Sequence, residues 1–160
     1  MAGGELLAGI TESRLFRRPP GELNAWQVIK WWELRRIPYN LIVGATGIVA
    51  VVIMATVAAI CQARIGVPMG IPDPPIIAVF AAFVFGVMAN VCFTLGWAVE
   101  LGIAQVWGSV PTRFGELAFA LGLLGSMLLA LLPAVVTVVV AVATLAGWLQ
   151  VPNGGGEFGG

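Results

Sequence analysis

Three long apolar segments limit the folds that this chain can adopt. They cover residues 41–63, 76–98 and 117–149. A helix needs about 20 apolar residues to cross the hydrocarbon core of a bilayer, because each residue adds only about 1.5 Å. The first two segments each match one span. The sequence therefore predicts an all-α membrane protein with a single transmembrane helical domain over residues 38–152.

The third apolar segment is harder to interpret. Its 33 residues are long for one span, yet two spans need about 40 residues and a turn. Pro133 lies inside it, but no polar residues flank the proline. We expect one long, tilted helix with a kink at Pro133, and a four-span arrangement is the alternative. The three expected spans cover about residues 39–63, 76–98 and 115–149.

The composition agrees with a membrane protein and limits its chemistry. Hydrophobic residues make up 59% of the chain and charged residues 10%, against about 25% charged in soluble domains. Histidine is absent, which removes the commonest general base near neutral pH and the commonest metal ligand. Phosphate-binding, dinucleotide-binding and metalloprotease motifs are also absent. We expect no enzymatic activity, no cofactor and no metal site.

The stretch IKWWELRRIPYN, residues 29–40, precedes the first span and is called the collar below. Asn24 and Gln27 have the spacing of a capping box, which predicts a helix start. Pro38 disfavours helix at the residue before it. We therefore expect a short interfacial helix over residues 25–37, a break, and then the first span.

The collar has the composition of an anchor at the water interface of a membrane. Tryptophan and tyrosine concentrate at that interface, and each basic residue near anionic headgroups contributes about 1 kcal/mol. A bilayer with anionic headgroups is thus the expected partner, and nucleic acid is not. A docking site for a protein or a specific anionic lipid is the alternative. The expected anchor residues are Trp31, Trp32, Glu33, Arg35, Arg36 and Tyr39.

Two contacts within the collar follow from helical spacing. Glu33 lies three residues from both Lys30 and Arg36, so it can pair with either cation. Arg35 lies four residues after Trp31 and can cover its ring.

The basic residues also predict an orientation. Six of the eight precede the first span, so the positive-inside rule places the N-terminus in the cytoplasm. Three spans then place the C-terminus outside. Residues 1–24 read as a flexible cytoplasmic tail, and the glycine-rich residues 153–160 as a second flexible tail.

Small residues recur every four positions in the second and third segments. Membrane helices pack where small side chains let their backbones approach, often in right-handed contacts. Packing within the chain explains these stripes, but a face left over for self-association or a partner subunit stays open. The expected packing residues are Ala82, Gly86, Asn90, Ala118, Gly122, Ser126 and Ala130.

Two polar residues of the second segment need partners. Asn90 calls for a hydrogen bond across helices, with Ser126, Thr46 or a backbone carbonyl as the expected partner. Glu100 lies 24 residues after Ile76, about 36 Å along a helix, and so past the hydrocarbon core. We expect it to pair with Arg113 or the collar arginines rather than to relay protons.

The collar pattern Trp31–Trp32–Glu33–x–Arg35–Arg36–x–x–Tyr39–Asn40 resembles that of small, uncharacterised bacterial inner-membrane proteins with a WWExRRxxYN collar before the first span. The later ANVCFTLGWAVE is similar to an ANxxYxLG stretch of the same group, with Phe93 where tyrosine is typical. The resemblance covers about the first two spans. It implies a bacterial inner membrane, but no activity, cofactor or site.

These features favour a non-enzymatic accessory or scaffold subunit, associated through small-residue helix faces with another membrane protein or with itself. An oligomeric pore or transporter component is the first alternative. A membrane enzyme acting on lipids is the second, and Glu33, Glu100 and Glu116 would be its place to look.

Overall fold

The computed structural model describes residues 24–66, 75–108 and 114–149. The tails expected over residues 1–24 and 153–160 lie outside this part of the chain, except for Asn24, and so does Arg113.

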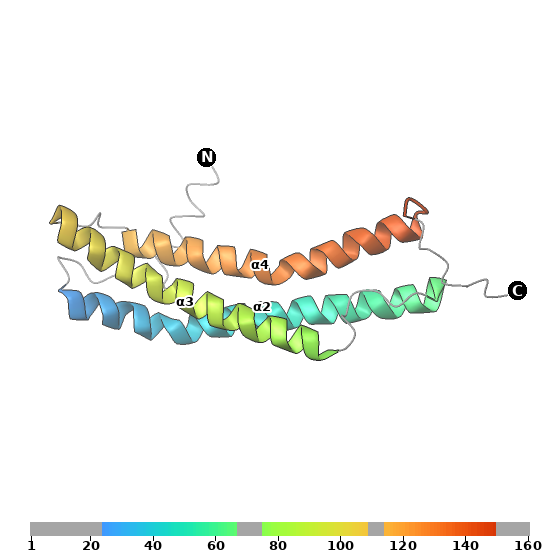
Figure 1. Ribbon diagram of the computed structural model, residues 1–160, viewed down its shortest axis with the longest axis horizontal. Helices are drawn as coiled ribbons and strands as arrows, with labels where there is room; N and C mark the ends of the chain where they lie inside the picture. Colours follow the sequence, from blue (N-terminus) through green and yellow to red (C-terminus); the bar gives the residue numbers. More distant parts are fainter. Residues whose placement is uncertain (1–23, 67–74, 109–113, 150–160) are drawn as a thin grey trace, which may run out of the picture.

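The described chain consists of three long helices, α2 (Ala25–Ile65), α3 (Pro75–Trp107) and α4 (Phe114–Leu145). Each is long and apolar enough to cross a membrane. Helices α2 and α4 run in the same direction and α3 runs against them (Figure 1). The prediction of an all-α, three-span membrane protein is confirmed. We call the end where α2 starts, α3 ends and α4 starts the proximal end, and the opposite end distal.

Helix α2 is continuous from the collar into the first span. Its start follows the prediction, because the side chain of Asn24 accepts from Gln27 N at 2.9 Å and the Gln27 side chain accepts from Asn24 N at 3.0 Å. The expected break is wrong, since the helix runs through Pro38 to Ile65. Proline costs a backbone hydrogen bond, but buried Trp32 before it and buried Tyr39 after it face the same neighbours. This packing holds both halves in one helix.

The other two helices differ from their expected spans mainly in length. Helix α3 continues past residue 98 to Trp107. Helix α4 passes through Pro133 without interruption and ends at Leu145, followed by a turn in which Gly147 has a φ of 77°. The four-span alternative is therefore wrong. Helix α4 bends about halfway along (Figure 1), as the proline predicts.

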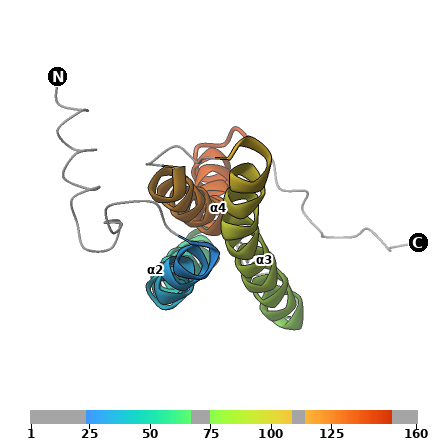
Figure 2. The same cartoon turned by 90° about the vertical axis from the view of Figure 1, so that its left-hand side faces the viewer.

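The core changes character from one end to the other. Seen from the proximal end, the three helices form a triangle (Figure 2), and large side chains fill the space between them. Farther along, the buried residues of α2 and α4 become small, including Ala50, Ala134 and Ala141. On α2 the buried positions Tyr39, Val43, Thr46 and Ala50 follow steps of four and three. Such steps are typical of near-parallel, left-handed packing.

Helix α3 is displaced toward the proximal end. Asn40 of α2 and Asn90 of α3 are hydrogen-bonded and so lie at one level. From Asn90, α3 continues for 14 residues to Ile76, about 21 Å. From Asn40, α2 continues for 25 residues to Ile65, about 37 Å. The distal parts of α2 and α4 thus extend beyond α3 (Figure 1).

Candidate functional site

An aromatic cluster joins the three helices at the proximal end. It consists of Trp31, Trp32 and Tyr39 of α2, Phe93 of α3 and Phe119 of α4. The ring centroids of Trp32 and Phe93 lie 5.4 Å apart at 83°, and those of Trp32 and Phe119 lie 6.1 Å apart at 76°. Edge-to-face pairs of this kind contribute about 0.5–1.5 kcal/mol each beyond burial.

This cluster shows that three of the expected anchor residues pack inside the bundle. Trp31, Trp32 and Tyr39 are 5%, 2% and 2% exposed, so their rings face other helices. The physical reason is that Phe93 and Phe119 offer aromatic partners, which spacing along one helix cannot reveal. Trp26 and Trp107 instead project outward, each 71% exposed.

Glu100 lies buried beside the aromatic cluster. It is 1% exposed, and its Oε2 accepts a hydrogen bond of 2.9 Å from Nε1 of Trp32. The prediction placed Glu100 at a water interface among arginines. The structure buries it and gives it a tryptophan donor, because the indole N–H of Trp32 points into the bundle; Arg113, one of its expected partners, lies outside the described residues. A buried carboxylate needs such donors to offset the loss of water.

Gly96 allows the Trp32 ring of α2 to pack closely against α3, and no sequence pattern above predicted this contact. A Cβ at Gly96 would lie 2.6 Å from the Trp32 ring. Gly86 and Gly122, the two glycines expected at helix contacts, have no atom within 4 Å of such a Cβ. Proximity to Trp32 in space, rather than a four-residue repeat, distinguishes the glycine that packing requires.

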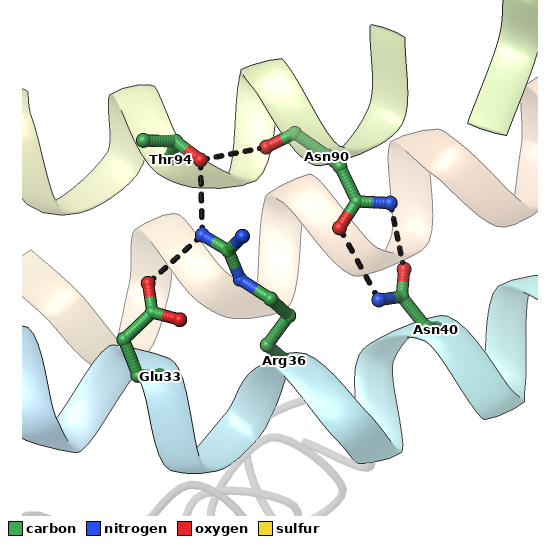
Figure 3. A network of polar contacts seen from close by, with 5 residues as sticks. All are labelled: Glu33, Arg36, Asn40, Asn90 and Thr94. Atoms are coloured by element: carbon green, nitrogen blue, oxygen red, sulfur yellow. Dashed lines mark hydrogen bonds and ion pairs between the residues drawn. The ribbon is translucent and has the colours of Figure 1, made fainter. Parts of the chain in front are cut away.

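Hydroxyl and amide groups make further bonds between the helices. Oη of Tyr39 lies 2.7 Å from Oγ of Ser126, which links α2 to α4. Asn40 and Asn90 exchange two side-chain hydrogen bonds of 3.2 and 3.0 Å (Figure 3). Asn90 thus bonds across helices as its chemistry requires, but to Asn40 rather than to Ser126 or Thr46. The Asn90 side chain also donates to the carbonyl of Gly86 in its own helix.

The collar arginines have different environments. Arg35 lies over the Trp31 ring, 3.9 Å from its centroid, and donates to the Trp31 carbonyl at 2.9 Å. Arg36 reaches α3 instead. Its Nη2 donates to Glu33 at 2.8 Å and to Thr94 Oγ1 at 3.0 Å (Figure 3), and its Cζ lies 5.3 Å from the Phe93 centroid. The expected pairing of Glu33 with a nearby cation is therefore confirmed for Arg36.

The remaining small residues are divided between inner and outer faces. Ala118 packs against the core cluster and Ala130 is half-buried. Ala82 and Gly122 are exposed. Part of the small-residue pattern is therefore not used between the described helices.

A groove runs along α3 beside the collar. Its volume is about 720 Å³. It is lined by Arg36 of α2 and by Phe83, Gly86, Val87, Asn90, Val91, Thr94 and Leu95 of α3.

The three glutamates in the described part of the chain differ in burial. Glu33 is exposed, Glu100 is buried, and Glu116 is half-buried in the first turn of α4. Among the described residues, no three histidine, cysteine, aspartate or glutamate side chains gather where they could hold a metal ion.

A scan against protein-family models finds no match to this chain, and searches of curated proteins and of solved structures find none either. Its function is therefore inferred from its own geometry.

Proposed function

We propose that this chain is a non-enzymatic accessory or scaffold protein of a bacterial inner membrane that associates with another membrane protein or with a second copy of itself. The collar resemblance supports the bacterial location. The basic residues before the first span support a cytoplasmic N-terminus.

The observation that carries the proposal is the way in which the polar side chains are used. Asn40 bonds Asn90, and Tyr39 bonds Ser126. Trp32 bonds Glu100 in the same way. These groups hold one helix to another, as expected of a rigid helical module. A pore would instead place such groups along a water-filled face, and a hydrolytic site would leave a nucleophile next to a base.

The outer face of α4 offers a surface for association. Gly122 is exposed between large side chains, with Leu121 62% exposed and Leu129 60% exposed. A glycine among exposed leucines makes a notch, and a Cβ there would meet nothing within 4 Å. Helices in lipid associate at such notches because the backbones can approach closely. Gly125, which is half-buried, extends the strip of small residues.

Co-purification from native-like membranes tests the proposal. The full chain, carrying a tag, is produced together with an untagged copy, extracted in polymer-bounded lipid discs, and captured. Quantitative mass spectrometry then measures both the untagged copy and other membrane proteins. We expect Gly122→Leu to reduce the associated protein at least fivefold, because the leucine fills the notch without disturbing the monomer.

Gly86→Leu is the matched control, since its added side chain also meets open space but lies on α3. It should leave the associated protein unchanged. The proposal fails if wild type captures neither a second copy nor a stoichiometric partner, or if Gly122→Leu captures as much as wild type.

A further inference from the structure

The groove on α3 is polar at one end and apolar along the rest, the same arrangement as in a phospholipid. Arg36, Thr94 and Asn90 line its proximal part, whereas Phe83 and Val87 line its distal part. The cationic side chain of Arg36 thus lies at one end of a mostly apolar groove. A lipid that enters from the bilayer presents the matching order, with a charged headgroup at one end and an acyl chain behind it.

Arg36 has hydrogen-bonding capacity left for a ligand. Among the described residues, Glu33 and Thr94 both bind Nη2, and Nε has no partner. Figure 3 shows the second terminal nitrogen, Nη1, turned toward Asn90 with no bond drawn to it. Asn90 and Thr94 are engaged with other protein groups. Nη1 can therefore donate a charge-assisted hydrogen bond to an anionic acceptor that enters the groove.

The dimensions of the groove also fit a lipid. Its α3 lining extends over 13 residues, from Phe83 to Leu95, or about 18 Å. One leaflet contributes about 15 Å of hydrocarbon. Thr94 lies 18 residues from Ile76, about 27 Å, so a hydrocarbon core about 30 Å thick that begins at Ile76 would end close to Arg36. Headgroup phosphates lie at that edge.

We infer that this groove binds one anionic phospholipid, with its phosphodiester on Nη1 of Arg36 and one acyl chain along Phe83, Val87 and Val91. The inference does not depend on the proposed association through α4. It assigns to Arg36 a specific ligand contact in addition to its bond to Thr94. A helix of another protein would fill the apolar part but would leave the guanidinium donors without an acceptor, so we favour the lipid.

Native mass spectrometry of the detergent-solubilised full chain tests the inference. Phosphatidylglycerol and phosphatidylcholine with identical acyl chains are titrated, and the fraction with one bound lipid is measured. We expect phosphatidylglycerol to bind about tenfold more tightly, the range of one charge-assisted hydrogen bond. Arg36→Gln should remove this preference. Lys30→Gln, which removes an exposed collar charge, is the matched control and should keep it.

Two further variants separate the headgroup from the chain and keep the test decisive if Arg36→Gln folds poorly. Glu33→Gln removes a negative charge beside Arg36, and should strengthen phosphatidylglycerol binding several-fold. Gly86→Leu fills the groove and should weaken both lipids, whereas Gly122→Leu should weaken neither.

Several results would overturn the inference. They are equal binding of the two lipids, loss of the preference in Lys30→Gln, no change in Glu33→Gln, or full competition by inorganic phosphate, which would mean that the acyl chain adds nothing. If Gly86→Leu leaves lipid binding intact but abolishes capture of a partner protein, the occupant is a helix and not a lipid.

Discussion

At the scale of single residues, Trp32 connects all three helices through one ring. It belongs to α2, packs on Phe93 and Gly96 of α3 and on Phe119 of α4, and donates to Glu100. The ring therefore has little freedom to move when a neighbour changes. Substitutions at these contacts should affect stability more than substitutions at the outward-facing tryptophans or at the open glycines.

Gly96→Ala should destabilise the fold. The added Cβ would lie 2.6 Å from a ring that is 2% exposed and held by Glu100, and overpacking costs about 1–3 kcal/mol. Glycine-to-alanine replacement in a helix returns about 1 kcal/mol. Gly122→Ala gains this helix propensity without a clash. We therefore expect the Gly122→Ala variant to be at least about 1 kcal/mol more stable than the Gly96→Ala variant. Unfolding in mixed detergent and dodecyl sulfate micelles measures the difference, and equal stability would contradict the close contact.

Trp32→Phe should lower the free energy of unfolding by about 1–3 kcal/mol, because it removes a donor from a buried carboxylate. Most of the aromatic packing is kept. Trp26→Phe alters a residue that is 71% exposed, so it serves as the control and should shift stability by less than about 0.5 kcal/mol. A double-mutant cycle with Glu100→Gln checks the pair itself. No coupling energy in that cycle would mean that the 2.9 Å bond contributes nothing.

At the scale of elements, apolar length and capping chemistry predicted most of the structure. The three spans follow from the number of consecutive apolar residues, and the start of α2 follows from Asn24 and Gln27. The break at Pro38 was predicted from local backbone preference alone. It is absent because side chains on both sides of the proline are buried against the same two helices. Tertiary packing of this kind is not encoded in any local window of sequence.

Continuity of α2 predicts a long, well-defined distance across Pro38. Spin labels at positions 26 and 60 replace exposed Trp26 and Ile60. They are 34 residues apart, so a continuous helix separates their backbones by about 51 Å. Pulsed electron–electron double resonance in lipid discs should give a narrow distribution of label-to-label distances near this value. Pro38→Gly restores the missing backbone N–H and is better tolerated inside a helix than proline, so it should leave the distribution as narrow. If the labelled helix that keeps Pro38 gave a broad distribution at shorter distances, the helix would be broken at Pro38 and the continuous α2 would be contradicted.

At the scale of the whole molecule, the sequence could not show which faces meet. The stripe of small residues correctly marked Ser126 and Asn90 as contact positions, since both bond across helices. It also marked Gly86 and Gly122, where the chain leaves open space. The placement of α3 explains part of this difference, because its first turns diverge from α2 and α4 (Figure 2), although both of those helices extend past that level. This placement depends on partners such as Trp32 and Glu100, which are 68 residues apart in sequence.

Three spans predict that the two ends of the described chain lie on opposite sides of the membrane, and the basic collar predicts which side. Cysteine is placed at Trp26 or at Trp148, which are 71% and 81% exposed, after Cys61 and Cys92 are changed to alanine. A membrane-impermeant maleimide should label position 148 in intact spheroplasts and position 26 only in inverted vesicles. The reason is that Lys30, Arg35 and Arg36 would have to cross the bilayer in the reverse orientation, at about 2.5–3.5 kcal/mol for each charge at its centre.

Thr56→Cys, on the apolar surface of α2, should be labelled from neither side and controls for leakage. Labelling of both ends from one side would contradict the three-span fold itself, whereas the two ends exchanged would contradict only the orientation.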